Sequence, residues 1–225
     1  MKKLLRGIDD FRRTRRAAYA DTFARLALGQ KPDAIAIACS DSRVSPVEFA
    51  STEPGDVFVV RNVGNLVPRY DEETGPRASS AGAAVEYALA VLPIEDIVVC
   101  GHSACGAMIA IHEGRIPPGT PHLDAWLEYG RHALEGIPPC PKGLAPHDHV
   151  SQQNVLRQVE NLRTYPAVRE GEHAGRLHLH AWWFDIARAE VLEFDRDAKR
   201  FAPLDEARIA RLLAERGEPP PPHAR

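Results

Sequence analysis

The stretch AIAIACSDSR, residues 34–43, indicates how this chain folds. Its first residues form a short apolar run of strand length, and at Cys39 the chain changes to small, polar and charged residues. Two further apolar runs, Val57–Val60 and Ile97–Cys100, follow along the chain. Because these runs are continuous rather than alternating, they are typical of strands buried on both faces of a parallel sheet.

An alanine-rich segment, Ser79–Leu92, lies between the second and third runs. Ser79 or Ser80 can cap its N-terminus and Pro93 follows its end, which predicts a helix. Strand, helix, strand is the order of an α/β domain. The predicted fold class is therefore α/β, with a mainly parallel β-sheet flanked by helices.

The rest of the chain adds elements on both sides of this unit. Further helices are predicted over Arg6–Leu28, Cys105–His112, His122–Leu134, His149–Arg163 and Glu206–Glu215, and further strands over Arg176–Phe184 and Val191–Phe194. We expect an N-terminal helical arm (1–30), a single α/β domain (31–216) and a Pro-rich, disordered tail (217–225).

Composition places the chain among ordinary globular proteins. Of 225 residues, 44% are hydrophobic and 26% charged, and the net charge is −3, which argues against collagenous, disordered and disulfide-dense classes. Residues 1–16 carry a local charge of +5. This basic start is compatible with nucleic acid, an anionic surface or an acidic partner face, but a helix docking on its own protein is favoured. We expect no nucleic-acid or membrane partner.

The sequence also predicts a cytoplasmic protein. Arg6 and Asp9 interrupt the segment where a signal peptide needs an apolar core, and no apolar run approaches the ~18 residues of a membrane span. In a reducing compartment, the four cysteines are expected to be thiols or metal ligands rather than disulfides.

Two polar segments follow the ends of predicted strands, where open α/β sheets bind ligands. The first begins at Cys39, and the second is Gly101–Gly106, which contains His102 and Cys105. Two thiolates and an imidazole form a Cys₂His set that binds Zn²⁺ and leaves a fourth tetrahedral position for water, substrate or another ligand. Each fragment alone is a weak signal, because an isolated cysteine at a strand end is usually a packing residue.

Asp41 and Arg43 strengthen this interpretation. They are two residues apart in a tight loop, where a guanidinium can hold a carboxylate in a bidentate fork. A carboxylate two residues from a zinc ligand can accept a proton or, when released by the arginine, bind the metal. The alternative is a surface ion pair of little energetic effect.

Four motifs together resemble those of the β-class carbonic anhydrases. They are CSDSRV (39–44), RNVGN (61–65), SAGAAVEYA (80–88) and GHSACGA (101–107), and they occur in that family's order and at its spacing. The likeness runs from about Arg12 to about Phe194.

The resemblance implies one Zn²⁺ per chain, held by Cys39, His102 and Cys105. It implies that Asp41 and Arg43 are the catalytic dyad, with Asp41 as a fourth ligand in a closed state.

The resemblance further implies that Gln30, Phe58, Tyr87 and the amide of Gly106 bind substrate. The first three match residues that line a cleft at a dimer interface, so a homodimer or a tetramer built from dimers is expected. On composition alone, Phe58 and Tyr87 are equally compatible with plain core residues.

Three other features of the sequence bear on this site. Some bacterial members of the family have a tryptophan of an inhibitory bicarbonate pocket where this chain has Ala36, although Arg61 matches another residue of that pocket. The segment His147–His149 resembles a ligand cluster, but a helix start explains its residues and is the favoured interpretation. His178 and His180 alternate on a strand, which favours a core or interface position.

The function expected from this resemblance is reversible hydration of CO₂ to bicarbonate and a proton. One alternative is a CS₂ or COS hydrolase on the same scaffold, because fold and ligands alone do not decide substrate. The other is a non-catalytic zinc or bicarbonate-sensing domain. A structural zinc site normally has four protein ligands and no need of an adjacent Asp and Arg, which argues against this second alternative.

Overall fold

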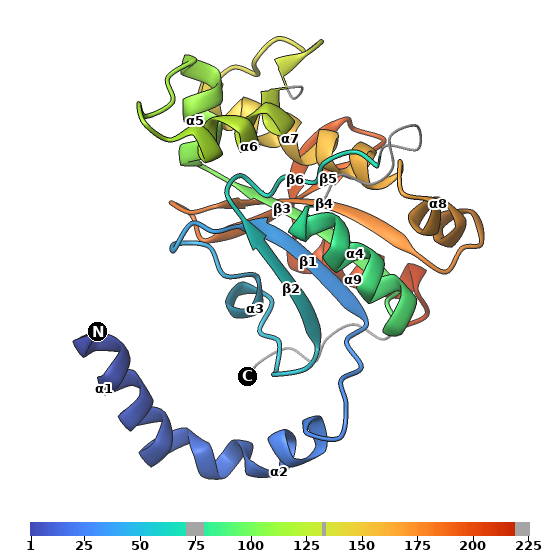
Figure 1. Ribbon diagram of the computed structural model, residues 1–225. Helices are drawn as coiled ribbons and strands as arrows, with labels where there is room; N and C mark the ends of the chain where they lie inside the picture. Colours follow the sequence, from blue (N-terminus) through green and yellow to red (C-terminus); the bar gives the residue numbers. More distant parts are fainter. Residues whose placement is uncertain (71–78, 132–133, 219–225) are drawn as a thin grey trace.

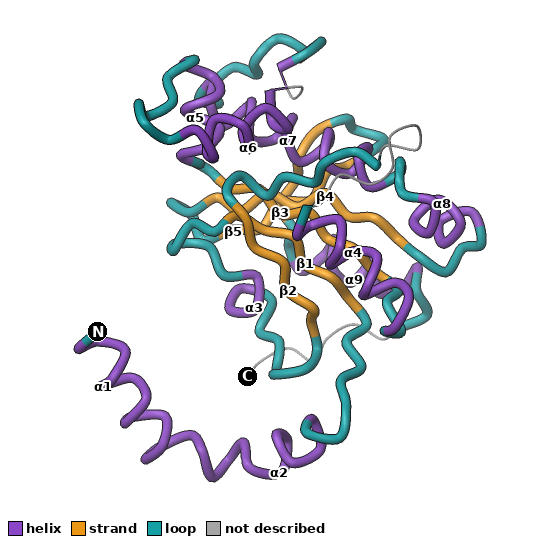
Figure 2. Tube along the Cα trace, viewed as in Figure 1, coloured by secondary structure: helices purple, strands orange, loops and turns teal. Residues whose placement is uncertain are grey.

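The centre of the molecule is a six-stranded sheet in the order β2-β1-β3-β4-β5-β6 (Figures 1 and 2). The computed structural model describes residues 1–70, 79–131 and 134–218. The strands are β1 (Ala34–Cys39), β2 (Val57–Asn62), β3 (Asp96–His102), β4 (His178–Asp185), β5 (Glu190–Asp195) and β6 (Arg200–Pro203). The first four strands pair in parallel, and β5 and β6 are antiparallel to their neighbours. The predicted α/β class is confirmed.

Helices cover both faces of this sheet. They are α3 (Pro46–Phe49), α4 (Ser80–Val91), α5 (Gly106–Glu113), α6 (Pro121–Arg131), α7 (Pro146–Leu162), α8 (Pro166–His173) and α9 (Glu206–Glu215). The main core lies between the sheet and α4, α7 and α8. The side chains of α3 and α9 meet the opposite face, and α5 and α6 pack with α7 beyond the ends of β1 and β3 (Figure 1).

The core is built from the apolar runs seen in the sequence. Ile35 and Ile37 of β1 and Ile97 and Val99 of β3 have no exposed surface, and they pack against buried side chains of the helices, including Val155 of α7. Each such side chain contributes about 1.5–3 kcal/mol relative to an exposed one. This rigid centre fixes where the strands end.

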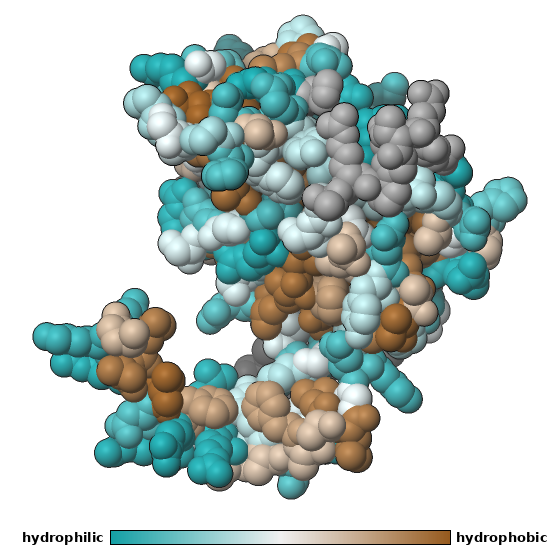
Figure 3. All heavy atoms as spheres, viewed as in Figure 1, coloured by the Kyte–Doolittle hydropathy of each residue, from teal (hydrophilic) through white to brown (hydrophobic). Residues whose placement is uncertain are grey.

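An N-terminal arm extends away from the sheet (Figure 1). It consists of α1 (Lys2–Asp10), a π-helical turn η1 (Phe11–Arg15) and α2 (Arg16–Leu26). None of these three elements contains a buried residue. Figure 3 shows apolar surface along this arm, where the large exposed side chains are Leu4, Leu5, Ile8, Phe11 and Phe23.

Most predicted elements are present with shifted ends. Glu206–Glu215 is confirmed as α9, and the side chain of Ser79 caps α4 by accepting from the Gly82 amide. Three short elements, α3, α8 and β6, were not predicted. The prediction of a disordered tail falls largely on residues 219–225, which lie outside the described residues. No described helix has the length and apolar character to cross a membrane.

Candidate metal site

Sheet order brings the two polar segments together. β1 and β3 are parallel neighbours, and Ala38 pairs with Cys100. Cys39 is the last residue of β1, and His102 is the last residue of β3 rather than part of the following loop. Cys105 lies at the N-cap position of α5. Three residues from two adjacent strand ends therefore face one point.

The candidate ligand atoms converge closely. The donor atoms of Cys39, His102 and Cys105 all lie within 4.8 Å of one another, and all three residues are buried. The two Sγ atoms are 4.0 Å apart. Two thiolates on one tetrahedral zinc ion lie roughly 3.8 Å apart. Among the described residues, this is the one group of His, Cys, Asp or Glu donors that meets the same criterion.

The imidazole of His102 is oriented for metal binding. Its Nδ1 lies 2.9 Å from the carbonyl oxygen of Ser103, to which the neutral ring donates from Nδ1. Nε2 is fully buried and has no hydrogen-bond partner. Buried polar atoms are almost always satisfied, so this lone pair indicates a ligand. The donor set therefore fits zinc.

The thiol of Cys39 is prepared to be a ligand. A hydrogen bond with Cys105 lowers the pKa of the Cys39 thiol, against the opposing effect of burial. The amide of Gly64 also donates to Cys39 Sγ at 3.4 Å. The neighbouring thiolate raises the pKa of Cys105. Cys100, predicted to be a packing residue, is fully buried in β3, and burial raises its pKa to about 12.

Asp41 and Arg43 form the bidentate pair expected from their spacing. Arg43 Nε donates to Asp41 Oδ1 at 2.9 Å and Nη2 donates to Oδ2 at 2.7 Å, and the Arg43 amide adds a third bond. These bonds hold the pKa of Asp41 well below its usual range, although burial opposes the shift. Asp41 Oδ2 lies 4.0 Å from His102 Nε2. An ionised carboxylate is thus held beside the ligands.

Arg61 holds the loop that carries Cys39 and Asp41. Its guanidinium donates to the carbonyl oxygens of Cys39 (2.9 Å), Asp41 (2.7 Å) and Val44 (2.8 Å). Sequence reasoning did not find this role, which depends on the pairing of β2 with β1. The resemblance placed Arg61 in an inhibitory pocket, whereas here its donors are directed at backbone carbonyls.

A cavity of about 540 Å³ adjoins the cluster. Cys39, Asp41 and Gly106 line it together with apolar residues that include Val63 and Leu123. A Cβ added at Gly106 would meet no atom within 4 Å. The missing side chain therefore leaves space beside the ligands.

Gln30, Phe58 and Tyr87 do not line this cavity. Phe58 pairs with Ile35, whereas the partner of Cys39 is Asn62, four residues farther along β2. At roughly 3.3 Å per residue, Phe58 lies about 13 Å from the metal end of its own sheet. Its ring contacts that of Tyr87 at 6.0 Å between centroids, and Tyr87 is 48% exposed. Tyr87 is therefore a surface residue, whereas Phe58 is partly buried against the main core.

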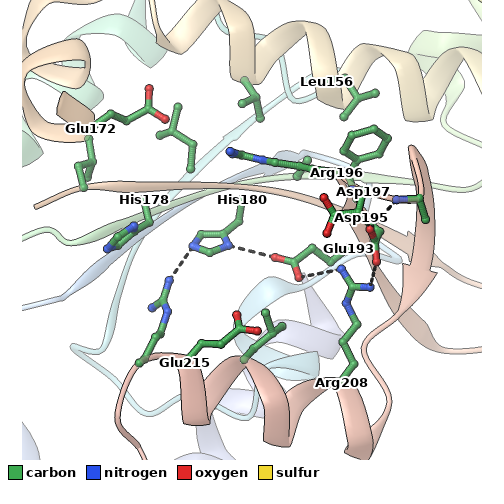
Figure 4. Close-up of a pocket in the computed structure, with 18 of the residues that line it drawn as sticks. Leu156, Glu172, His178, His180, Glu193, Asp195, Arg196, Asp197, Arg208 and Glu215 are labelled. Carbon is green, nitrogen blue, oxygen red and sulfur yellow. Dashed lines mark hydrogen bonds and ion pairs between the residues drawn. The ribbon is translucent and has the colours of Figure 1, made fainter. Parts of the chain in front are cut away.

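A larger cavity, of about 1190 Å³, lies elsewhere, and no metal ligand lines it (Figure 4). Charged pairs occupy its walls, including Arg208 with Glu193 and Asp195. His180 lies in the same network and is largely buried, whereas His178 is exposed in this chain, so a core position is wrong for His178. Within residues 1–70, 79–131 and 134–218, the one group of converging metal donors is the cluster at the ends of β1 and β3.

Comparisons with known proteins agree with this geometry. Residues 34–191 match the carbonic anhydrase family model. The chain is 42% identical over 217 residues to a carbonic anhydrase of Pseudomonas aeruginosa, covering 94% of this chain and 96% of that protein.

Solved structures give the same result. The β-carbonic anhydrase CcaA superposes with a TM-score of 0.80 at 36% identity, covering 91% of this chain and 92% of that one. A chain from the study of two tetrameric β-carbonic anhydrases of Sordaria macrospora gives a TM-score of 0.71 at 30% identity, covering 85% and 95%.

Proposed function

This chain belongs to the β-class carbonic anhydrase family, and we propose that Asp41 and Arg43 form the catalytic pair beside its zinc site. The reaction is the reversible hydration of CO₂ to bicarbonate and a proton. One observation supports the assignment of the pair: a carboxylate held by a guanidinium lies 4.0 Å from the Nε2 ligand atom.

Cys39, His102 and Cys105 hold the zinc ion and leave one tetrahedral position open. Zinc is a Lewis acid that makes water a nucleophile near neutral pH. Asp41 accepts the proton that this chemistry releases, because Arg43 keeps the carboxylate ionised and oriented. Arg43 also restrains Asp41 from becoming a fourth ligand, so the closed state requires this pair to open.

Gly106 contributes a backbone donor to substrate binding. It is the first residue of α5, where amide groups have no partner within the helix. An oxygen of bicarbonate can accept from this amide in the space that the missing side chain leaves. The apolar lining by Val63 and Leu123 suits CO₂, which has no net charge or dipole.

A second copy of the chain supplies Gln30, Phe58 and Tyr87. The half-buried Phe58 of the edge strand β2 contacts the exposed ring of Tyr87 on α4, and Gln30 is exposed on the segment before β1. The distance of Phe58 from the metal end of its own sheet supports assigning these residues to the site of a partner. We therefore propose a homodimer, or a tetramer built from dimers, in which the arm packs on the other subunit.

We also propose a cytoplasmic location. Cys39, Cys100, Cys105 and Cys140 are all free thiols in the structure. Cys140 is exposed, and an exposed thiol persists in a reducing compartment.

Stopped-flow CO₂ hydration tests the catalytic pair. Arg43→Ala should lower kcat on the order of 100-fold while zinc stays near one per chain, because Asp41 loses its anchor but all three zinc ligands and the Asp148 bond to Ala104 remain. Arg188→Ala, which removes another exposed Asp–Arg pair, is the control and should hydrate CO₂ at the wild-type rate. Wild-type hydration by Arg43→Ala would refute the role of the pair.

Parallel assays with COS and CS₂ compare the substrates that the same three ligands could serve. We expect CO₂ to be turned over fastest. Faster hydrolysis of either sulfur compound would identify the chain as a hydrolase on this scaffold.

A further inference from the structure

The segment between β3 and α5 contains a strained residue. Ala104 adopts a left-handed backbone conformation with φ of 51°, which residues with a side chain rarely take up. It stands between the ligands His102 and Cys105. The angle at Ala104 therefore decides how the two ligands face each other.

Groups from outside the segment hold both polar atoms of Ala104. Its amide donates to Asp148 Oδ1 at 2.6 Å, and its carbonyl oxygen accepts from Arg43 Nη2 at 3.1 Å. The Asp148 side chain is only 16% exposed, so water competes poorly for this bond. Hydrogen bonds to a charged acceptor are short and strong, as this distance indicates.

Asp148 belongs to a surface of α7 that faces the metal segment. Ser151, three residues later on the same side of α7, donates to the carbonyl oxygen of His102 at 2.8 Å. The indole of Trp183 donates to Ser151 Oγ and fixes its direction. One turn of α7 thus contacts the backbone on both sides of Ser103.

We propose that Asp148 is a positioning residue for zinc, acting through the amide of Ala104. It touches neither the metal nor the substrate space. It holds the left-handed turn that aims His102 and Cys105 at one point. The sequence suggested only a helix start or a weak ligand cluster for this residue, and its neighbour His149 is directed to the carbonyl oxygen of Pro138.

A set of substitutions at position 148 separates this role from a simple charge at the start of α7. Asp148→Asn removes the charge but keeps an oxygen at the same distance from the backbone. Asp148→Glu keeps the charge but moves the oxygen by one methylene. Asp148→Ala removes both. His147→Ala is the control for the surroundings of Asp148, because it removes the imidazole 3.6 Å from Asp148 Oδ1 and keeps the bond between that oxygen and the Ala104 amide.

The measurement is the rate at which zinc-loaded protein releases zinc to a chromophoric chelator, together with the visible spectrum after cobalt substitution. Asp148→Ala and Asp148→Glu should release zinc about tenfold faster or more and shift the cobalt bands. Asp148→Asn and His147→Ala should stay within about threefold of wild type, with the cobalt bands unchanged.

Several results would overturn the proposal. One is wild-type release by both Ala and Glu variants, even if their Tm falls, since this would leave Asp148 a role in stability alone. Another is slow zinc release by Asp148→Glu together with fast zinc release by Asp148→Asn. This result would assign the effect to the negative charge at the start of α7. If Asp148→Ala does not fold, the comparison of Asp148→Asn with Asp148→Glu decides between the two roles. The inference rests on the zinc site, and because zinc release needs no CO₂, it is judged separately from the Asp41 and Arg43 proposal.

Discussion

His102 shows how the hydrogen bond at one ring nitrogen decides the chemistry of the other. The Ser103 carbonyl engages Nδ1, so the proton of the neutral imidazole resides there and the lone pair of Nε2 is available. Burial makes an unsatisfied Nε2 costly. Zinc binding therefore removes a penalty within the folded chain, and metal binding and folding are linked.

Replacing one ligand should show this linkage. We expect Cys39→Ser to retain far less than one zinc per chain, because a hydroxyl is a much poorer ligand than a thiolate. The free energy of unfolding should fall by several kcal/mol, since metal that binds only the folded state stabilises it. Elemental analysis and thermal unfolding measure the two effects. Cys140→Ser, which changes an exposed thiol, is the control and should keep the zinc content and the thermal stability of the wild type. One zinc per chain in Cys39→Ser would exclude Cys39 as a ligand.

Gly106 offers a test in which stability and activity change in opposite directions. Gly106→Ala adds a methyl group where no atom lies within 4 Å, at the start of a helix that alanine favours. We expect unchanged or slightly greater stability, by up to about 1 kcal/mol, and a clear decrease in kcat/KM, because the methyl group occupies the space beside Cys39 and Asp41.

Gly114→Ala is the control for Gly106→Ala and should differ from it in both stability and kcat/KM. Gly114 ends α5 with φ of 63°, so alanine there should cost stability and leave kcat/KM unchanged. A Gly106→Ala enzyme with wild-type kcat/KM would show that this space is not used by substrate.

The sequence allowed prediction of the ligands but not of the groups that orient them. Ligand chemistry resides in the side-chain types, and predicted strand ends were sufficient to bring Cys39 and His102 together. Asp148 is 44 positions from Ala104, and its bond depends on how α7 packs on β3. No local pattern encodes such a contact.

At the scale of elements, length and composition decided which predictions succeeded. The strands with continuous apolar runs and the alanine-rich α4 were predicted closely. α3, with four residues, and β6, with four residues at the sheet edge, are too short for a periodic pattern. α7 begins at Pro146, three residues before its predicted start, because proline fits the first turn of a helix.

α9 is attached to the sheet by a network around His180 (Figure 4). His180 Nε2 lies 2.8 Å from Asp96 at the start of β3, and Nδ1 lies 3.1 Å from Glu193 of β5. Arg216, just after α9, donates to both oxygens of Asp96 and lies 3.0 Å from His180 Nε2. Arg208 of α9 pairs with Glu193. Carboxylates at both ring nitrogens favour the imidazolium form.

This network predicts a pH dependence of stability. Burial alone would lower the pKa of His180, but the bonds to Asp96 and Glu193 outweigh it and raise the pKa. A raised pKa in the folded state means that the stabilisation is complete below the unfolded pKa of about 6.5 and is lost as pH rises through the folded value. We expect urea unfolding to show a free energy of unfolding that falls as the pH rises from about 6.5 through the folded pKa of His180.

His180→Gln should abolish this slope, because glutamine does not titrate. His178→Gln is the matched control on the same strand and face, at an exposed position, and should retain the wild-type slope. Equal slopes in wild type and His180→Gln would show that His180 does not carry the effect.

At the scale of the whole molecule, a single chain leaves large apolar side chains exposed to solvent in two regions. Figure 3 shows these regions on the arm and around the α4–β2 side. Exposed side chains there include Leu5, Ile8, Val59, Tyr87 and Val91. Contiguous apolar surface of this kind marks interaction sites, and β2 is also an open sheet edge. An assembly that covers both regions would also bring Phe58 and Tyr87 to another chain.

Light scattering should therefore give a mass of at least twice the 24.8 kDa of one chain. Ile8→Lys, which places a charge on the apolar side of the arm, should shift the mass toward the monomer and reduce CO₂ hydration with it. Arg6→Gln, which changes a neighbouring charged residue of α1, should do neither. A monomeric wild type with full activity would contradict the assembly and the shared site together.

Subunit mixing shows which chain completes which site. Cys39→Ser lacks a zinc ligand but presents an intact Gln30, whereas Gln30→Ala keeps zinc and lacks the amide that we assign to its partner. Each variant alone should have low activity. After dissociation and reassembly in equal amounts, half of the dimers are mixed, and each mixed dimer has one zinc site completed by an intact Gln30. Activity should recover to about a quarter of the wild-type value per chain. If Gln30 served its own zinc site, mixing would restore nothing, because no chain would contain both residues.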